Sequence, residues 1–247
     1  MNSICIATYN GEKYIYDQLV SILTQIDQND EVIISDDGSI DRTLDIIRNL
    51  NDPRIIILNG NFQNVIMNFE NALNYAKGEC IFLADQDDIW LPYKYSKCLT
   101  LLNVFDLVVS DAFVTDDKLD IIEQSFFKHY GSGKGIIKNI IRSTYFGSCM
   151  AFSKKILNVA LPFKDYNEIG HDLWIGLIAE MTGKVLFLNE PLILYRRHAD
   201  TFTNISTGLN RSQRDLSRKI KGRIIMCKCL ISFYFKRFQK SKLCKKD

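Results

Sequence analysis

Apolar and polar residues follow two different periods along the first 90 residues of the chain. Short apolar runs predict strands over residues 3–8, 31–35, 54–58 and 80–84, the last of them fully buried. Between these runs, apolar residues recur every three or four positions, which predicts helices over residues 12–25, 42–50 and 64–77. Strands that alternate with helices in this way form a parallel sheet with right-handed crossover connections. The pattern therefore predicts an α/β fold.

The pattern after residue 90 is less regular. Apolar runs predict strands over residues 105–114, 147–152, 185–188 and 192–195, and a helix is expected over residues 172–181. Residues 121–135 show no clear period, so we expect a loop there, which could be mobile. No internal repeat, low-complexity segment or linker rich in Pro, Gly or Ser divides the chain. We therefore expect one α/β domain over residues 1–210.

Residues 211–247 differ from the rest of the chain in charge. They contain 13 Lys or Arg against 2 Asp or Glu, a net charge of +11, whereas residues 1–210 carry −9. The mostly apolar run over residues 224–235 is too short to cross a bilayer core of ~30 Å. A helix there could instead lie in the interface of an anionic membrane, or pack on the domain as a solvated helix. We therefore expect residues 211–247 to form a basic amphipathic helical tail.

Cysteine usage and the first residues of the chain bear on location. The seven cysteines are an odd number, and two of them lie in strand-like apolar runs. This favours reduced thiols in a cytosolic protein over a disulfide framework. The chain begins with a strand pattern, so we expect no signal peptide, and no apolar run reaches the ~18 residues of a membrane span. We expect a cytoplasmic protein, peripheral on the inner face of the cell membrane, with no nucleic-acid partner.

The apolar run over residues 80–84 ends in three carboxylates within four positions, Asp85, Asp87 and Asp88. Open α/β sheets bind ligands at the edge where their parallel strands end. Carboxylates held this close repel one another unless a cation offsets their charge. Hard oxygen ligands favour Mg²⁺ or Mn²⁺, which usually share their coordination shell with substrate phosphates. The alternative is a solvated acidic turn that caps the next helix.

Two earlier strand ends carry polar groups suited to a nucleotide. Thr8, Tyr9 and Asn10 offer a hydroxyl, an aromatic face and an amide, which suit stacking on a base and hydrogen bonding to its edge. Asp36 and Asp37 offer carboxylates that can accept from a base or from ribose hydroxyls. The chain has neither a Gly-x-Gly-x-x-Gly motif nor a Gly-Lys-Ser/Thr loop, so we expect a metal ion to meet the phosphate charge of a nucleoside diphosphate.

These strand ends belong to a set of seven short motifs. They are Ala7-Thr8-Tyr9-Asn10-Gly11, Ser35-Asp36-Asp37-Gly38-Ser39, Asn68-Phe69-Glu70-Asn71-Ala72-Leu73, Ala84-Asp85-Gln86-Asp87-Asp88-Ile89-Trp90, Gly147-Ser148-Cys149, His171-Asp172-Leu173-Trp174 and Tyr195-Arg196-Arg197-His198. In this order, over about residues 3–205, they resemble the family 2 inverting glycosyltransferases. The resemblance implies the GT-A fold, a Rossmann-like and mostly parallel central sheet flanked by helices. The sequence is similar in particular to the rhamnosyl-, glucosyl- and galactosyltransferases of bacterial surface polysaccharide synthesis.

The resemblance also implies roles for individual residues. Thr8 and Asp37 would bind the base, Asp85 and Asp87 would form the metal-binding Asp-x-Asp motif, and Asp88 would orient the donor sugar. Asp172 would be the catalytic base, although an Asp at this position is also a common N-terminal helix residue. The implied reaction moves a hexose from a UDP- or dTDP-sugar to a saccharide hydroxyl, in one displacement with no enzyme nucleophile. If the acceptor is carried on a lipid diphosphate, as in O-antigen or capsule synthesis, a basic tail bound to the membrane would bring the enzyme to its acceptor.

Several further side chains are weaker candidates. His198 could complete the metal shell or touch the diphosphate. The candidates for the acceptor or sugar pocket, each with a structural role as its alternative, are Trp90, Asp111, Gly147, His171 and Trp174.

The sequence departs from the family pattern at two places. Residues 61–65 lack the glycine of the usual Asn-x-Gly, and Asp200-Thr201 replaces the Asn that often follows the histidine of the last motif. Two other classes of protein also stay open. A nucleotidyltransferase would have a basic glycine-rich loop after the first strand, and a non-catalytic nucleotide- or metal-binding module would not need Asp172.

Overall fold

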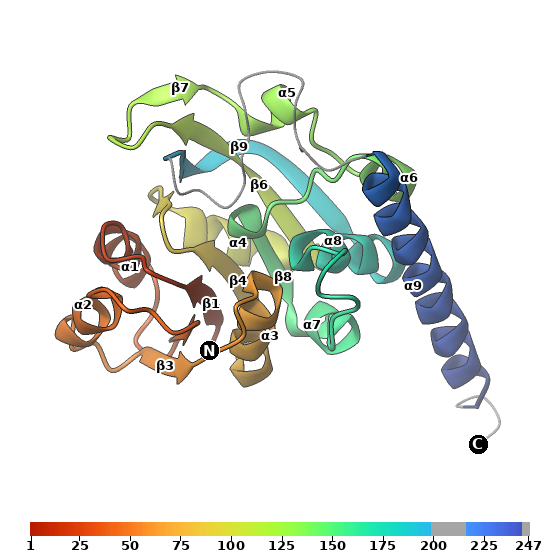
Figure 1. Ribbon diagram of the computed structural model, residues 1–247, viewed down its shortest axis with the longest axis horizontal. Helices are drawn as coiled ribbons and strands as arrows, with labels where there is room; N and C mark the ends of the chain where they lie inside the picture. The colour runs from red at the N-terminus through yellow and green to blue at the C-terminus, as the bar shows by residue number, and fades with distance from the viewer. Residues whose placement is uncertain (199–215, 244–247) are drawn as a thin grey trace.

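The computed structural model describes residues 1–198 and 216–243 of the chain (Figure 1). Within these ranges, nine strands form one sheet in the order β3-β2-β1-β4-β8-β6-β9-β5, with β7 paired to β6. The strands are β1 (Ser3–Thr8), β2 (Glu31–Asp36), β3 (Ile55–Asn59), β4 (Cys80–Asp85), β5 (Ile89–Trp90), β6 (Leu107–Thr115), β7 (Ile121–Glu123), β8 (Met150–Ser153) and β9 (Val185–Arg196).

The first four strands form the parallel half of the sheet. β1 pairs in parallel with both β2 and β4, and β2 pairs in parallel with β3. In register, Thr8 lies beside Asp36, and Ala7 lies beside Asp85. The carboxyl ends of these strands therefore meet at one edge, as the alternating sequence pattern predicted.

The second half of the sheet is mixed. β8 runs antiparallel to both β4 and β6, β5 runs antiparallel to β9, and β6 and β9 are parallel. The long strand β9 includes both of the short strands that the sequence predicted, over residues 185–188 and 192–195. Between them the chain stays extended, and Pro191 lies at a register shift in the pairing with β6. Its last residues reach the edge where β4 ends.

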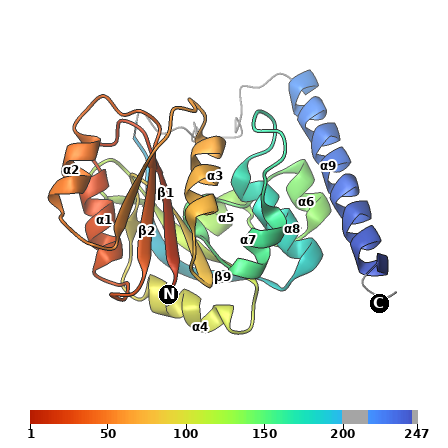
Figure 2. The same ribbon diagram turned by 90° about the horizontal axis from the view of Figure 1, so that it is seen from below.

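Helices cover both faces of the sheet. α1 (Ile15–Leu23), α2 (Thr43–Asn49) and α4 (Lys94–Leu102) pack on one face, over Ile4 and Phe82. The opposite face carries α3 (Val65–Tyr75), α5 (Phe126–Tyr130), α7 (Lys154–Ala160) and α8 (His171–Thr182), which pack over Cys5 and Leu83 (Figure 2). Alternate residues of one strand thus enter opposite cores, which is why the buried strands are apolar at nearly every position.

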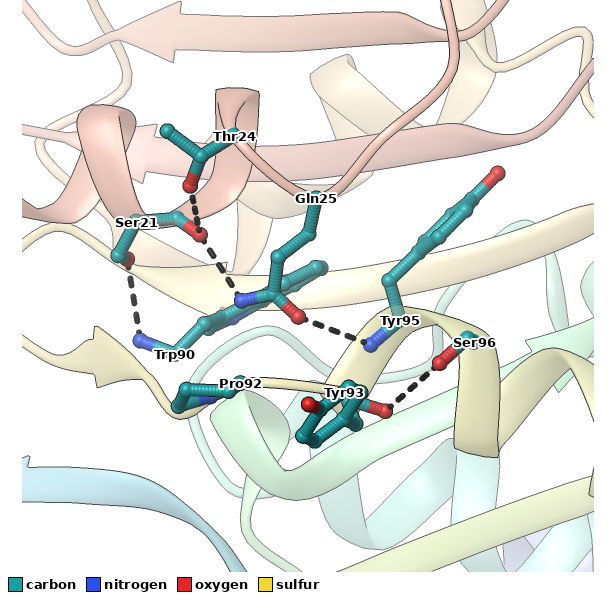
Figure 3. Close-up of a pocket in the computed structure, with 8 residues that line it drawn as sticks. All are labelled: Ser21, Thr24, Gln25, Trp90, Pro92, Tyr93, Tyr95 and Ser96. Carbon is teal, nitrogen blue, oxygen red and sulfur yellow. Dashed lines mark hydrogen bonds between the residues drawn. The ribbon is translucent and has the colours of Figure 1, made fainter.

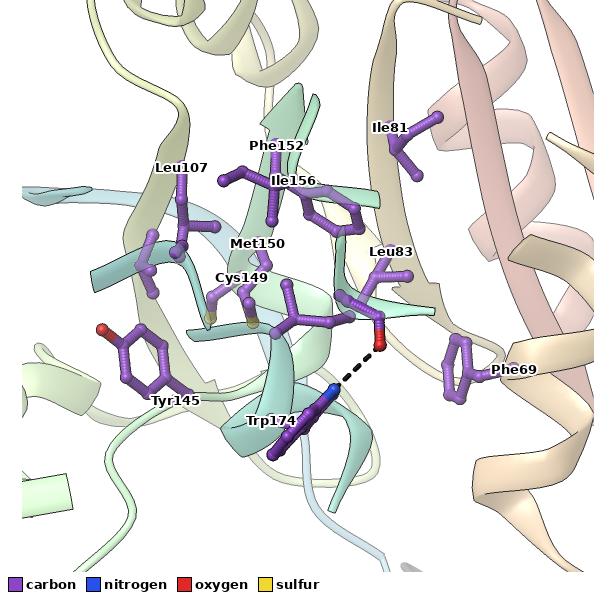
Figure 4. Close-up of a cluster of buried hydrophobic side chains, with 14 of the residues drawn as sticks. Phe69, Ile81, Leu83, Leu107, Tyr145, Cys149, Met150, Phe152, Ile156 and Trp174 are labelled. Atoms are coloured by element: carbon purple, nitrogen blue, oxygen red, sulfur yellow. Dashed lines mark hydrogen bonds between the residues drawn. The ribbon is translucent and has the colours of Figure 1, made fainter. Parts of the chain in front are cut away.

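The larger of the two cores fixes the helix that carries the candidate base. Trp174 is 1% exposed, and its indole N–H donates to the Ala160 carbonyl at 2.8 Å (Figure 4). Phe69 of α3 and Leu83 of β4 belong to the same buried cluster. Because a buried indole needs both packing and a hydrogen-bond partner, this anchor holds α8 in one position against the sheet.

Residues 121–135, expected as a loop, contain two short elements. β7 pairs with β6, and α5 is preceded by its N-cap Ser125, whose hydroxyl accepts a hydrogen bond from the Lys128 N–H at 3.1 Å. Short elements of three and five residues are below the length at which a period can be detected, which explains the error. Similarly, the run predicted as a strand from residue 147 begins as a 3₁₀ turn, Gly147–Cys149, before β8.

The C-terminal helix α9 (Leu216–Leu243) packs at the side of the domain, beside α6 (Ile136–Ile141) (Figures 1 and 2). Residues 211–215 and 244–247 of the expected tail, and Asp200-Thr201, lie outside the described residues. None of the helices in the described ranges is long and apolar enough to cross a membrane. All cysteines within the described ranges are free thiols, in agreement with the sequence prediction.

Candidate active site

The carboxylates after β4 form a crowded acidic turn at the sheet edge. Asp88 is 1% exposed and accepts a hydrogen bond from the backbone N–H of Arg196 at 3.0 Å. Burial, followed by the charges of Asp87 and Asp172, raises the pKa of Asp85 to about 7. Burial and the charges of Asp87 and Asp85 also raise the pKa of Asp88 well above its usual range. Such a cluster favours the binding of a cation, because a cation would stabilise the ionised carboxylates.

Asp87 of the acidic turn and the neighbouring His198 form the pair of side chains best suited to a metal ion. The His198 Nε2 lies 2.9 Å from the Asp87 Oδ2, and the His198 ring packs on Tyr14 with 4.4 Å between centroids. In the residues that the structure describes, no group of three His, Cys, Asp or Glu side chains is arranged to hold a metal. Mg²⁺ and related ions often take only one or two protein ligands and complete their shell with phosphates and water. The Asp87–His198 pair fits that kind of site.

Asp172 lies at the first turn of α8. Its Oδ1 accepts a hydrogen bond from the Leu173 N–H at 2.7 Å, and burial raises its pKa to about 6. The charge of Asp172 contributes to the raised pKa of Asp85, so the two carboxylates lie close enough to interact across the site. The structure therefore brings together the acidic turn and Asp172, which are more than 80 positions apart in the sequence.

His171 and Gly147 form the wall next to Asp172. The His171 ring stacks on Phe69 with 4.2 Å between centroids, and burial lowers its pKa to about 3, so the ring is neutral near pH 7. A side chain at Gly147 would place its Cβ 3.1 Å from the His171 Nε2, so glycine leaves room for the ring there. Within the described residues, that buried nitrogen has no hydrogen-bond partner, so it is available to a ligand.

The carboxylate of Asp36 shapes the loop that follows β2. It accepts hydrogen bonds from the Thr8 hydroxyl at 3.0 Å and from the Ser39 hydroxyl at 2.6 Å, and its other oxygen accepts from the N–H groups of Gly38 and Ser39. Two of the predicted donor-site residues, Thr8 and Asp36, are thus hydrogen-bonded to each other. Their roles toward a nucleotide stay predictions.

Asp37 holds the loop before α3. Its carboxylate accepts from the backbone N–H groups of Phe62, Gln63 and Asn64. Gln63 has a φ of +49°, in the left-handed region that favours glycine. Gln63 lies within residues 61–65, the stretch that lacks a glycine, so its side chain stands on a backbone conformation that it adopts at a cost.

We expect Gln63→Gly to raise the free energy of unfolding by up to about 1 kcal/mol, because relief of the left-handed strain outweighs the extra freedom of glycine in the unfolded chain. Urea unfolding measures this change. Gln63→Ala is the matched control, since it removes the side chain and keeps the strain. A fall of more than about 1 kcal/mol for Gln63→Gly would show that the side chain itself stabilises the loop.

Tyr9 and Asn10 lie on the surface of the loop after β1. The Gln86 amide accepts from the Tyr9 N–H at 3.0 Å and donates to the Tyr9 carbonyl at 3.1 Å, which ties this loop to the acidic turn. Asn10 accepts from the Ile40 N–H at 3.0 Å. The Tyr9 ring is 55% exposed and so is available for stacking on a base.

Three candidates for the sugar pocket take structural positions instead. Trp90 and Trp174 are both at most 2% exposed and belong to the two cores, so they take the core role that the sequence left open. Asp111 accepts from the Ser125 hydroxyl and from the Phe127 N–H, which holds the start of α5.

Arg196 and Lys94 support the acidic turn, and sequence reasoning gave neither a role. The Arg196 Nε donates to the Asp87 carbonyl at 2.9 Å, and its guanidinium lies 4.8 Å from the Tyr14 ring. Lys94 is fully buried and donates to the Ser148 carbonyl at 3.2 Å. Arg196 is part of a quoted motif and could have been chosen from it, whereas a lysine at a helix start gives no signal of burial.

A separate surface pocket of about 450 Å³ lies between α1 and the start of α4 (Figure 3). Its lining includes Ser21, Gln25, Trp90 and Tyr95, and the Gln25 amide oxygen accepts from the Tyr95 N–H at 3.4 Å. None of the acidic residues discussed above lines it. We therefore place the candidate active site at the sheet edge rather than in this pocket.

The fold and this edge of carboxylates define the class of protein. The model of the family "Glycosyl transferase family 2" matches residues 3–160, and the chain belongs to that family. It is 43% identical over 185 residues to the UDP-Glc:alpha-D-GlcNAc-diphosphoundecaprenol beta-1,3-glucosyltransferase WfaP of Escherichia coli, an alignment that covers 72% of this chain and 70% of WfaP.

Solved structures show the same fold. S. aureus TarS 1-349 in complex with UDP-GlcNAc superposes with a TM-score of 0.66 at 19% identity, over 87% of this chain and 61% of that one. The mannosyltransferase PcManGT from Pyrobaculum calidifontis, in complex with GDP-Man and Mn²⁺, gives a TM-score of 0.56 at 17% identity, over 79% and 56%. The chain thus spans about three fifths of the length of these structures. The GT-A fold expected from the sequence is confirmed.

Proposed function

We propose that this chain transfers a hexose, with inversion, from a nucleoside diphosphate sugar to a hydroxyl of a saccharide acceptor. The observation that carries the proposal is that the charge of Asp172 acts on Asp85 of the acidic turn, although the two residues come from opposite halves of the chain. An inverting transfer needs a carboxylate base on the acceptor side and charge compensation on the leaving group's side. A protein that only binds a nucleotide needs no such base.

Asp172 is proposed as the base. Burial holds its pKa at about 6, so the carboxylate is ionised near pH 7 yet basic enough to accept the proton of the attacking hydroxyl. The first turn of α8 and the Leu173 N–H fix the direction of its carboxylate. His171 lies beside Asp172 and is neutral, so its ring can accept a hydrogen bond from the acceptor sugar or donate one to it.

Asp87 and His198 are the proposed ligands of a divalent cation, Mn²⁺ or Mg²⁺, with Asp85 beside them. When bound, this ion would offset the negative charge of the diphosphate leaving group. The Mn²⁺ in the PcManGT complex supports the use of a divalent cation. Arg196 supports the Asp87 backbone, and we propose that Asp88, which accepts from the Arg196 N–H, orients the donor sugar.

The donor and acceptor classes follow from the relatives. WfaP, at 43% identity, is named as an enzyme that uses UDP-Glc and an acceptor on diphosphoundecaprenol. We propose a UDP- or dTDP-hexose as the donor and a lipid-diphosphate-linked saccharide as the acceptor, in the synthesis of a bacterial surface polysaccharide. The cytoplasmic location expected from the sequence stays a prediction.

Thermal unfolding with UDP-glucose, UDP-galactose and dTDP-rhamnose, each with Mn²⁺ or with EDTA, tests the donor part of this proposal. A ligand that binds only the folded chain raises the midpoint by mass action, so we expect one donor to raise it in the presence of Mn²⁺ and to lose most of that effect in EDTA. An equal rise in EDTA would contradict the metal dependence. The absence of a rise with any nucleotide sugar would contradict the donor site itself.

A further inference from the structure

The helix α9 has one apolar face that packs on the domain. Met226 and Leu230 are buried, and Phe233 meets Trp174 edge to face with 6.3 Å between ring centroids. At its other end, a Cβ at Gly222 would lie 3.3 Å from Glu168, just before α8 begins. This inward face accounts for the attachment of α9 to the helix that carries Asp172.

A second apolar face of α9 points outward. At 3.6 residues per turn, its members fall within an arc of about 100°, whose centre lies about 110° around the helix from Met226 and Leu230. They are Ile220, Ile224, Ile231, Tyr234 and Phe235, each between 50% and 59% exposed. A helix that only packs on a domain needs one apolar face, so the outward face requires another explanation.

The neighbouring helix α6 extends this outward face. Its Ile137 and Ile141 are 75% and 60% exposed, and Arg223 of α9 donates to the Ile141 carbonyl. The two helices lie side by side at the outer edge of the molecule (Figures 1 and 2). We call these seven exposed residues of α6 and α9 the outer apolar face.

Basic residues border the outer apolar face on both sides. Lys221 and Lys228 flank the α9 stripe on one side, and Arg223 flanks it on the other. The helix α9 contains nine Lys or Arg and no Asp or Glu over its whole length. Lys138 of α6 adds a further exposed cation. The surface thus combines apolar side chains with charge of one sign.

We propose that the outer apolar face of α6 and α9 docks on an anionic lipid bilayer, with its isoleucines and aromatic rings below the headgroups and its Lys and Arg among the phosphates. Apolar side chains bordered by cations are the pattern of helices that lie in a membrane interface. A second copy of this chain fits less well, because it would bring the nine positive charges of each α9 together.

This inference deepens the proposed function by naming the surface on which the enzyme meets a lipid-linked acceptor. Because α9 packs on α8, a bilayer bound to α9 holds Asp172 at a fixed distance from the lipid surface. The involvement of α6 goes beyond the C-terminal tail, since Ile137 and Ile141 precede α9 by about 80 positions. The docking itself depends on neither the donor nor the base.

Vesicle flotation of the full chain tests the docking. We expect binding to vesicles that contain phosphatidylglycerol, weaker binding to phosphatidylcholine alone, and a loss of binding as salt is raised. The double variant Ile224→Glu/Ile231→Glu should weaken the partition coefficient by at least about tenfold, because two exposed apolar side chains become charged. Its melting temperature should stay close to that of the wild type, since both positions are exposed.

Ile122→Glu is the matched control, because Ile122 lies on β7, away from α9, and is 50% exposed like Ile224. We expect this variant to bind vesicles as the wild type does. Equal binding by the Ile224→Glu/Ile231→Glu variant, or no binding by the wild type, would overturn the proposal. A dimer in sedimentation that the double variant breaks, without vesicle binding, would assign the face to a second copy. Failure here leaves the donor-binding test unaffected, so the two proposals can fail separately.

Discussion

The Asp172→Asn variant should lose at least about 10²-fold in kcat while its affinity for donor and cation stays nearly unchanged. The amide keeps the shape of the side chain and can still meet the Leu173 N–H, but it cannot take the proton of an attacking hydroxyl. Steady-state kinetics at saturating acceptor, together with calorimetric titration of the donor, measure the two effects separately.

The pH profile gives a second measure of the same group. Burial raises the pKa of Asp172 to about 6, so protonation removes the base as the pH falls through that value. We expect the wild-type rate to fall on the acid side of about pH 6, and the small residual rate of Asp172→Asn to lack this limb.

Asp45→Asn is the control for both measurements. Asp45 also lies in the first turn of a helix, α2, but it is exposed and forms only an ion pair with Arg48 at 3.6 Å. It should keep wild-type kinetics, because loss of a charge at an exposed helix start changes stability only slightly. If Asp172→Asn behaves like this control, then Asp172 is only an N-terminal helix residue and the base lies elsewhere.

The Asp87→Asn variant should lose cation and donor affinity together, by at least about tenfold each. Mutation of a residue that only hydrogen-bonds to a metal ligand already lowers metal affinity by about tenfold or more, and a ligand should matter at least as much. The amide can keep the contact with His198 while removing the charge that a divalent ion requires. Calorimetric titration of Mn²⁺, and of the nucleotide sugar with Mn²⁺ present, measures both constants.

Asp120→Asn removes the same charge from the exposed turn before β7 and serves as the control for net charge. It should bind both ligands as the wild type does, because exposed charges at a distance are screened by salt. Retention of donor affinity by Asp87→Asn, with Mn²⁺ binding lost, would instead show that donor binding does not depend on the cation.

The sequence predicted the parallel half of the fold because its signals are long and repeated. Four apolar strands, each followed by a helix or a turn, can be arranged in few ways, and β1, β2, β3 and β4 pair as that pattern requires. The second half was harder. Strand β7 has three residues and α5 has five, and both depend on tertiary contacts such as Asp111 with Ser125 rather than on local period.

The candidate site shows the same division. Asp85 and Asp87 could be chosen from the sequence because a buried strand ending in carboxylates is unusual in itself. Trp90 and Trp174 could not be assigned, because an aromatic residue beside a motif has the same sequence signal in a core as in a cleft. Gln63 shows a third case, in which the residue type contradicts the backbone conformation that the loop adopts.

Part of the outer apolar face could be predicted from the sequence. The charge of the tail and the apolar run over residues 224–235 predicted an amphipathic helix. The sequence did not indicate that α9 has two apolar faces, or that Ile137 and Ile141 join the outward one. Both depend on which side of α9 meets α8, which only the packed structure defines.

The configuration of the product tests the central claim most directly. The purified chain, with Mn²⁺, a nucleoside diphosphate hexose and a saccharide on a lipid diphosphate, should form a new glycosidic bond whose anomeric configuration is opposite to that of the donor, as read from the anomeric proton signals in the NMR spectrum of the product. A single displacement assisted by Asp172 gives only this outcome. Retention of the donor's configuration would contradict the account, because it requires a second displacement or a different mechanism.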